Sequence, residues 1–353
     1  MKPLYRERSG VCSRGWLFLG EQGGPCDKAC EFCYYAHQKN LVFFSLETLL
    51  GHANLFRHYY GLDACDITGG EATIYKGIVE LVRHCAAIGL RPTIITHGQN
   101  NRDDWRLGFD RPLYQEIEDA GLDDWLISLH GGSAESHDKI LCQSGSFDRL
   151  LEGLDRVRRP VRFNSTLVES NYMDLPVNVL ADRPPTVWNP IMFNPFHYWS
   201  DKTGQTEIDF QAKYREIAPY LARAIERLEP LGWEVNVRYW PLCIAEEFGF
   251  AANVSGYHQV PFDPWEWRLS VTNRVPLEAI EKEGGWYAAE RALATRTVSR
   301  RSNEICGGCR YRAICDKPPE QYQAKYGLAE LRPVAGGVEQ DPLVFQGKRA
   351  IAT

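Results

Sequence analysis

Three cysteines lie close together in the segment Gly24-Pro25-Cys26-Asp27-Lys28-Ala29-Cys30-Glu31-Phe32-Cys33-Tyr34-Tyr35, at the spacing C-x3-C-x2-C. A cysteine that serves as a small buried hydrophobe has no reason to recur at such offsets. A structural zinc site takes four protein ligands, and this loop supplies three. A four-iron cluster bound by Cys26, Cys30 and Cys33 would keep one iron open to a small molecule. The loop therefore favours an iron–sulfur site with an open iron, and a zinc half-site is the alternative.

Composition narrows the class of protein. The 353 residues suit one large α/β domain with a small annex, and 44% hydrophobic residues are ample for a core. We find no apolar run of about 18 residues and no apolar signal region at the N-terminus, so we expect a cytoplasmic protein without a membrane partner. A net charge of −6 argues against a duplex nucleic-acid partner. In a cytosolic chain, eleven cysteines indicate metal ligands more than disulfides.

Short apolar strands alternate with helices along the chain, and this rhythm predicts βαβ units with parallel pairing. The predicted strands are residues 15–19, 64–68, 92–96, 125–129, 161–167, 187–193 and 233–238, and the predicted helices are 45–60, 76–88, 113–120, a segment from 146, and 210–228. Pro190 weakens the sixth strand because proline donates no ladder hydrogen bond. The pattern alone leaves a doubly wound sheet and a partial barrel open. In both folds, ligands gather at the carboxyl ends of the strands.

The loop after the second predicted strand reads Gly69-Gly70-Glu71. Its two glycines allow the backbone to approach a ligand closely, and its carboxylate can pair with an ammonium group. An acidic residue at a helix start is the ordinary alternative. The loop after the third strand begins with Thr96 and His97.

Together, the cysteine loop and the Gly-Gly-Glu loop resemble the radical S-adenosylmethionine (radical SAM) superfamily. The resemblance implies a (β/α)6 partial barrel in which Cys26, Cys30 and Cys33 hold a [4Fe-4S] cluster, with SAM on the open iron. It also implies that SAM is reductively cleaved to a 5′-deoxyadenosyl radical. That radical would abstract a hydrogen from a peptide or small-molecule substrate, giving oxidation, rearrangement or bond formation. The resemblance also implies that Phe32 contacts the adenine of SAM and that Gly69, Gly70 and Glu71 orient SAM.

The fourth predicted strand ends in Ser128-Leu129-His130-Gly131, and Gly145-Ser146-Phe147 follows. This stretch resembles the branch of the superfamily with a C-terminal auxiliary-cluster domain, called SPASM or, in its shorter form, twitch. The resemblance makes Thr96, Ser128 and Asn164 candidate SAM contacts, although Asn164 is equally an ordinary interior asparagine.

This chain departs from that branch at two positions. His130 replaces the usual aspartate, and Leu141 stands where relatives often have an arginine that pairs with the SAM carboxylate. Either Lys139 or Arg162 then serves as the cation, or the carboxylate is held differently.

A second group of cysteines, Cys306, Cys309 and Cys315, has the spacing C-x2-C-x5-C, and Cys243 lies upstream. Four thiolates complete a site for zinc or for an iron–sulfur cluster. The resemblance to the SPASM/twitch branch implies one auxiliary [4Fe-4S] cluster. If Cys243 is not a ligand, that cluster has an open iron that could bind substrate.

These inferences divide the chain into an N-terminal arm (1–14), a barrel (15–237), an auxiliary-cluster domain (238–325) and a tail (326–353). The resemblance implies a flavodoxin- or ferredoxin-type reductant. Only about 15 residues precede the barrel, which lowers the expectation of a leader-peptide substrate. The rival interpretations are an iron–sulfur electron-transfer protein without SAM chemistry and a zinc-stabilised α/β binding protein.

Overall fold

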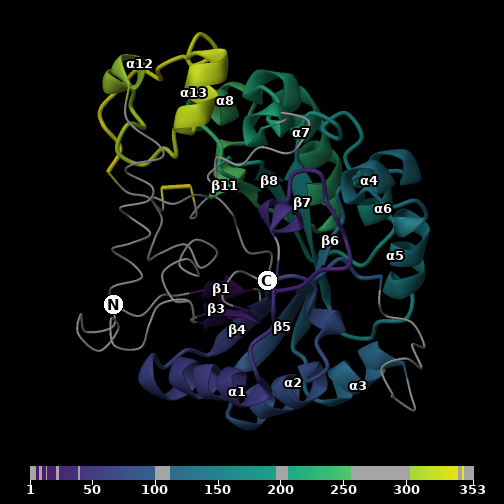
Figure 1. Cartoon of the computed structure of the whole chain (residues 1–353). Helices are drawn as coiled ribbons and strands as arrows, with labels where there is room; N and C mark the ends of the chain where they lie inside the picture. Colours follow the sequence, from purple (N-terminus) through teal and green to yellow (C-terminus); the bar gives the residue numbers. More distant parts are fainter. Residues whose placement is uncertain are drawn as a thin grey trace.

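The structure is a computed structural model, shown in Figure 1. It describes residues 5–7, 10–12, 14–20, 24–38, 40–99, 112–195, 206–255, 303–340 and 344–345. Of the N-terminal arm, it describes an antiparallel hairpin of β1 (Tyr5–Glu7) and β2 (Gly10–Cys12). No helix of the described residues is long and apolar enough to cross a membrane.

One parallel sheet organises the rest of the chain. Its strands are β3 (Arg14–Phe18), β4 (Ala64–Thr68), β5 (Arg91–Thr96), β6 (Asp124–Ser128), β7 (Val161–Leu167), β8 (Val187–Met192), β10 (Val237–Arg238) and β11 (Val254–Ser255), and each lies beside the next in chain order. The short strand β9 (Glu234–Val235) also pairs with β8. A doubly wound sheet would reverse its strand order at a switch point, and this sheet does not. The predicted partial barrel is therefore confirmed, with its edges at β3 and β11 unpaired to each other.

The expected strand at 233–238 is broken into β9 and β10. Both pieces keep one register against β8, because Val187 faces Glu234 and Ile191 faces Arg238. The interruption is Asn236, which this register places opposite Asn189 and next to Pro190, a residue with no N–H to donate to the ladder.

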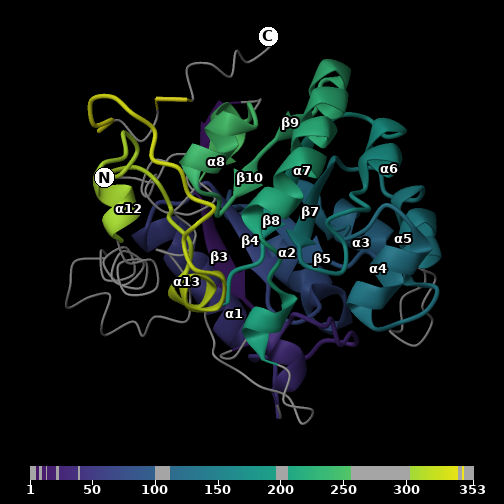
Figure 2. The same cartoon turned by 90° about the horizontal axis from the view of Figure 1, so that it is seen from above.

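Helices cover the outer face of the curved sheet (Figures 1 and 2). They are α1 (Leu46–Asn54), which continues as a π-helical turn over Leu55–Tyr59, and α2 (Ile78–Ala87), α3 (Leu113–Asp119), α4 (Ala134–Leu141), α5 (Ser146–Leu154), α6 (Val177–Ala181) and α7 (Tyr214–Leu228). Helix α1 is capped as predicted, since the Ser45 hydroxyl accepts from the Thr48 N–H at 3.2 Å. Helix α7 begins later than expected, because Thr206 and Asp209 cap a separate 3-10 turn over Glu207–Phe210.

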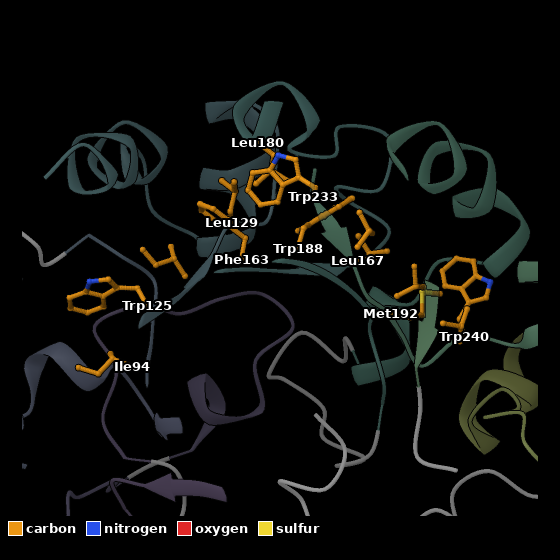
Figure 3. Packing of buried hydrophobic residues seen from close by; sticks show 14 of the residues in the cluster. Ile94, Trp125, Leu129, Phe163, Leu167, Leu180, Trp188, Met192, Trp233 and Trp240 are labelled. Carbon is orange, nitrogen blue, oxygen red and sulfur yellow. The ribbon is translucent and has the colours of Figure 1, made fainter. Parts of the chain in front are cut away.

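The core lies between the sheet and these helices. Figure 3 shows Trp125, Phe163, Trp188 and Trp233 on this side of the sheet, and all four are buried. A buried indole N–H needs a hydrogen-bond partner. The indole N–H of Trp188 has one, because it donates to the Ser165 hydroxyl at 2.8 Å. This layer fixes the strands and so the positions of the loops that follow them.

A buried polar cluster fills the barrel at the amino ends of the strands. The Arg14 guanidinium donates to Asp66 at 2.7 Å and to Thr93 at 2.7 Å. The Arg162 guanidinium donates to Thr93 at 3.1 Å and pairs with Asp124. Arg162 therefore lies at the end of the barrel away from the cysteine loop. The expectation that it is a cation for a ligand carboxylate there is wrong.

We expect Arg14→Met to lower the free energy of unfolding by roughly 3 kcal/mol, because Asp66 would be left as a buried carboxylate without its closest cation. The Arg14–Asp66 side chains are both fully buried. Chemical denaturation of the anaerobic protein measures this. Arg14→Met combined with Asp66→Leu should recover most of the loss, and a single variant as stable as the parent protein would contradict the argument.

The C-terminal segment packs beside α7. It contains α12 (Glu304–Gly307) and α13 (Glu320–Tyr326), which are drawn with α8 (Leu242–Glu247) at the top of Figure 1. The rings of Tyr214 and Tyr322 are 4.8 Å apart. Arg215, on α7, donates to the Glu330 carbonyl at 2.7 Å and pairs with Glu247 on α8. These contacts join the annex to the barrel.

Candidate functional site

The cysteine loop follows β3 and lies at the carboxyl ends of the strands. Within it, the Cys33 N–H donates to the Cys30 carbonyl at 2.9 Å, and a 3-10 turn begins at Tyr34. The Glu31 N–H donates to the Ile140 carbonyl at 2.9 Å, which ties the loop to the end of α4. The loop is thus fixed by one hydrogen bond within itself and by another to the end of α4.

The three thiols lie near enough to affect one another's ionisation. Burial, followed by the nearby carboxylate of Glu71, raises the pKa of Cys26 to about 12. Burial and the neighbouring thiols Cys33 and Cys26 also raise the pKa of Cys30. Three thiolates therefore require a cationic centre to stabilise them. Among the described residues, no three His, Cys, Asp or Glu side chains gather closely enough for one metal ion. Three thiol donors from one loop fit a cluster in which each thiolate binds a different iron.

The Gly-Gly-Glu loop is joined directly to the start of the cysteine loop. The Glu71 N–H donates to the Pro25 carbonyl at 2.9 Å. Gly70 has φ +64°, and a Cβ on it would lie 2.0 Å from the same Pro25 oxygen. Only glycine permits both this backbone conformation and this approach. The two loops therefore behave as one unit.

The Glu71 carboxylate is 1% exposed and is surrounded by donors. It accepts from the Thr73 N–H at 3.0 Å, the Thr73 hydroxyl at 2.6 Å, the Thr96 hydroxyl at 2.6 Å and the His97 N–H at 3.0 Å. Thr96, a candidate SAM contact, is thus a direct partner of Glu71. The two residues come from the loop after β4 and the end of β5.

His97 links this carboxylate to the cysteine loop. Its Nδ1 accepts from the Gln99 N–H at 3.2 Å, so the neutral ring carries its proton on Nε2. That Nε2 is 2.8 Å from the Asp27 carboxylate and 3.2 Å from Glu71. Burial alone would raise the pKa of Asp27, but the hydrogen bonds from His97 and Lys28, with the charge of Lys28, outweigh burial and hold that pKa below its usual range.

The other two polar candidates lie on adjacent strands. Ser128 on β6 pairs with Asn164 on β7, and both side chains are half-buried. The Asn164 side-chain oxygen accepts from Asn189 on β8 at 2.8 Å. Asn189 was missed by the sequence reasoning. Its position opposite Asn164 could have been found only from the register of β7 and β8.

Phe32 packs between two rings at the barrel mouth. It lies 5.3 Å from His130, edge to face, and 5.9 Å from Phe193. Nδ1 of His130 accepts from the Thr166 N–H at 3.1 Å. Burial, and then the neighbouring His137, lower the pKa of His130 to about 3. The histidine that replaces the usual aspartate is therefore neutral at pH 7.

A cavity of about 510 Å³ opens beside the cysteine loop. Its wall comes from the cysteine loop, the following turn and the end of α4. The lining residues are Pro25, Cys26, Asp27, Lys28, Ala29, Tyr35, Ala36, Gln38, Leu41, Leu141, Cys142 and Gln143. Asp27 and Lys28 were not candidates at the sequence level, although their position between two cysteines was a usable signal.

The four late cysteines line one small pocket in the C-terminal segment, and the structure brings Cys243 together with Cys306, Cys309 and Cys315. The Leu242 N–H approaches the Cys315 sulfur at 3.3 Å, and the Val334 N–H approaches the Cys309 sulfur at 3.4 Å. Such N–H donors stabilise thiolates.

Burial raises the pKa of Cys243 to about 11, and the nearby thiols Cys309 and Cys306 contribute. A cationic centre is therefore needed here too. Leu331, in the segment expected to be a tail, also lines the pocket, so that segment contributes to the site.

Comparison with known proteins identifies the barrel. Residues 23–177 match the family model described as the radical SAM superfamily, and the chain carries a radical SAM domain. Over 133 residues, it is 34% identical to PqqA peptide cyclase of Methylocella silvestris, covering 37% of this chain and 33% of that protein. It is 30% identical over 131 residues to a probable GTP 3′,8-cyclase of Saccharolobus islandicus, covering 36% of this chain and 39% of that protein.

A solved structure has a similar fold. The structure of SuiB from Streptococcus suis bound to S-adenosylmethionine aligns with a TM-score of 0.55 at 14% identity, covering 84% of this chain and 70% of that one. At 14% sequence identity, this similarity supports a shared fold and nothing further. The matched regions span between a third and two-fifths of the curated relatives.

Proposed function

We propose that this protein is a radical SAM enzyme that reductively cleaves SAM and abstracts a hydrogen from its substrate. The observation that carries the proposal is the junction of the cysteine loop with the Gly-Gly-Glu loop. The Glu71 N–H bonds to the Pro25 carbonyl, and Gly70 packs against it. This junction puts three thiols and a buried carboxylate at one end of a radical SAM barrel.

In this proposal Cys26, Cys30 and Cys33 hold a [4Fe-4S] cluster. When bound, such a cluster would pass one electron to SAM, which would break the S–C5′ bond to give methionine and a 5′-deoxyadenosyl radical able to remove a hydrogen atom from an unactivated C–H bond. The residues of this chain position the bound molecules and keep water out. Of the SAM contacts we propose, Gly69, Gly70 and Glu71 orient the amino acid end, Phe32 packs near the adenine, and Thr96, Ser128 and Asn164 are further contacts.

We further propose that the late cysteines hold an auxiliary [4Fe-4S] cluster of the SPASM/twitch type, with Cys243 as the fourth ligand. The four thiols that share one pocket support this. The C-x2-C-x5-C spacing, which resembles that branch, favours iron–sulfur over zinc. A fully ligated cluster here would accept an electron from a product radical or help to position the substrate.

Replacing one late cysteine tests this second site. We expect Cys306→Ala to lower the iron content from about eight to about four per chain, because a four-iron cluster loses one of its four thiolates. Anaerobic reconstitution followed by iron and sulfide analysis gives the count. Cys85→Ala, at a buried free cysteine on α2, is the matched control and should keep all the iron. Unchanged iron in Cys306→Ala would remove the auxiliary cluster from the proposal.

A peptide is the substrate class that we favour, with a small molecule as the alternative. PqqA peptide cyclase is named for a peptide substrate, and another structure of the SuiB fold, at a TM-score of 0.50, is bound to the precursor peptide SuiA. The GTP 3′,8-cyclase relative is named for a nucleotide.

The experiment for the function itself is anaerobic reconstitution followed by addition of SAM and dithionite. Formation of 5′-deoxyadenosine supports the proposal. A protein that takes up iron but neither binds SAM nor forms this product would instead be an electron-transfer protein. One or two zinc ions and no iron would indicate a zinc-stabilised binding protein.

We also propose a flavodoxin- or ferredoxin-type reductant and a cytoplasmic location. Both are supported by the thiol-rich sites, since a reducing compartment preserves such cysteines.

A further inference from the structure

The cavity beside the cysteine loop contains a buried cation. Of the described residues that line it, only Lys28 carries a positive charge. The Lys28 side chain is 5% exposed, and its ammonium lies 2.5 Å from the Asp27 carboxylate. An ammonium group has three donors, and burial of a charge is costly without further partners. Lys28 is therefore suited to bind an anionic group that enters the cavity.

Lys28 is held in place by a chain of charged and polar groups that ends at Glu71. Asp27 contacts Lys28 through one carboxylate oxygen and His97 through the other. The same His97 nitrogen is 3.2 Å from Glu71. One chain of contacts thus fixes an ammonium in the cavity wall and a carboxylate at the neighbouring strand end. Glu71 itself is 1% exposed and does not line the cavity, so the cationic group that the described residues present to the cavity is the Lys28 ammonium.

The other cations considered for this role lie elsewhere. Arg162 is paired with Asp124 at the opposite end of the barrel. Lys139 is exposed on α4. Leu141, at the end of the same helix, lines the cavity but has no charge. Lys28 is therefore the cation in this cavity wall that could pair with a bound carboxylate, because Leu141 carries no charge.

We propose that Lys28 binds the carboxylate of the methionine part of SAM, and that Asp27 and His97 position it. This inference rests on the proposed function, because it assigns a contact for the same ligand. It predicts that Lys28 contributes to SAM affinity but not to iron binding, since its side chain is not a metal ligand.

The test uses the anaerobically reconstituted holoprotein and equilibrium dialysis with labelled SAM. We expect Lys28→Met to weaken SAM binding about 10- to 100-fold, because a buried carboxylate loses a charge-assisted partner. Lys28→Arg should keep most of the affinity. Lys139→Met is the matched control and should bind SAM like the parent protein. The EPR signal of the reduced cluster should respond to SAM only at correspondingly higher concentrations in Lys28→Met.

A second probe isolates the carboxylate. The parent protein should prefer SAM to decarboxylated SAM, and this preference should shrink about tenfold in Lys28→Met. An undiminished preference, or SAM affinity within twofold of the parent protein, would overturn the assignment while leaving the proposed function intact. A parent protein that takes up iron but binds no SAM would instead refute the function. If Lys28→Met takes up less iron, Lys28→Gln provides the same comparison.

Discussion

Cys30→Ala should lose the cluster of the cysteine loop and, with it, all formation of 5′-deoxyadenosine. Iron should fall from about eight to about four per chain, because the auxiliary site is separate and keeps its own thiols. Cys30 is the best choice of the three, since its thiol is affected by both Cys26 and Cys33. Iron analysis and chromatography of the SAM products measure the two effects.

Cys142→Ala is the control, and it is a demanding one. Cys142 is a free cysteine that lines the same cavity as Cys26 and is near enough to Cys30 to affect its pKa. We expect Cys142→Ala to keep all iron and to cleave SAM normally. If Cys142→Ala lost about four irons, the loop cluster would have a fourth protein ligand, and the open iron on which SAM binding depends would not exist.

The sequence was sufficient for the parts of the fold that depend on local pattern. Apolar runs such as 125–129 predicted the strands, and Ser45 predicted the start of α1, because burial and capping act over a few residues. Pro190 was recognised as a weak point in its strand. Its further effect, the division of the neighbouring strand into β9 and β10, required the register between strands that are far apart in sequence.

Less of the candidate site could be predicted. The cysteines and the Gly-Gly-Glu loop were recognised from spacing and residue type. The contact of His97 with Asp27 joins residues 70 positions apart, and no local pattern encodes it. Arg162 was misassigned although its place at the start of the predicted strand 161–167 already puts it at the amino end, away from the side where ligands gather. The place of Leu331 beside the late cysteines likewise depends on how the chain returns after α13.

Gly70→Ala should abolish SAM cleavage while changing no functional side chain. Its Cβ would lie 2.0 Å from the Pro25 oxygen and 2.4 Å from the Gly24 oxygen, both of them backbone atoms that cannot rotate away. Alanine would also hold φ +64° at a cost of roughly 1 kcal/mol relative to glycine. Relief requires the start of the cysteine loop to move away from Glu71. A displacement of about 1 Å at a reacting centre can cost 100-fold in rate.

The matched control is Gly51→Ala within α1, where an added Cβ would meet nothing within 4 Å. It should leave SAM cleavage unchanged and stabilise the protein by about 0.5–1 kcal/mol, since alanine favours the helix. Rates of 5′-deoxyadenosine formation and thermal unfolding of both holoproteins provide the comparison. If Gly70→Ala kept its iron and cleaved SAM within twofold of the parent rate, the close junction of the two loops would not be what organises this site. The function would then have to rest on the cysteines alone.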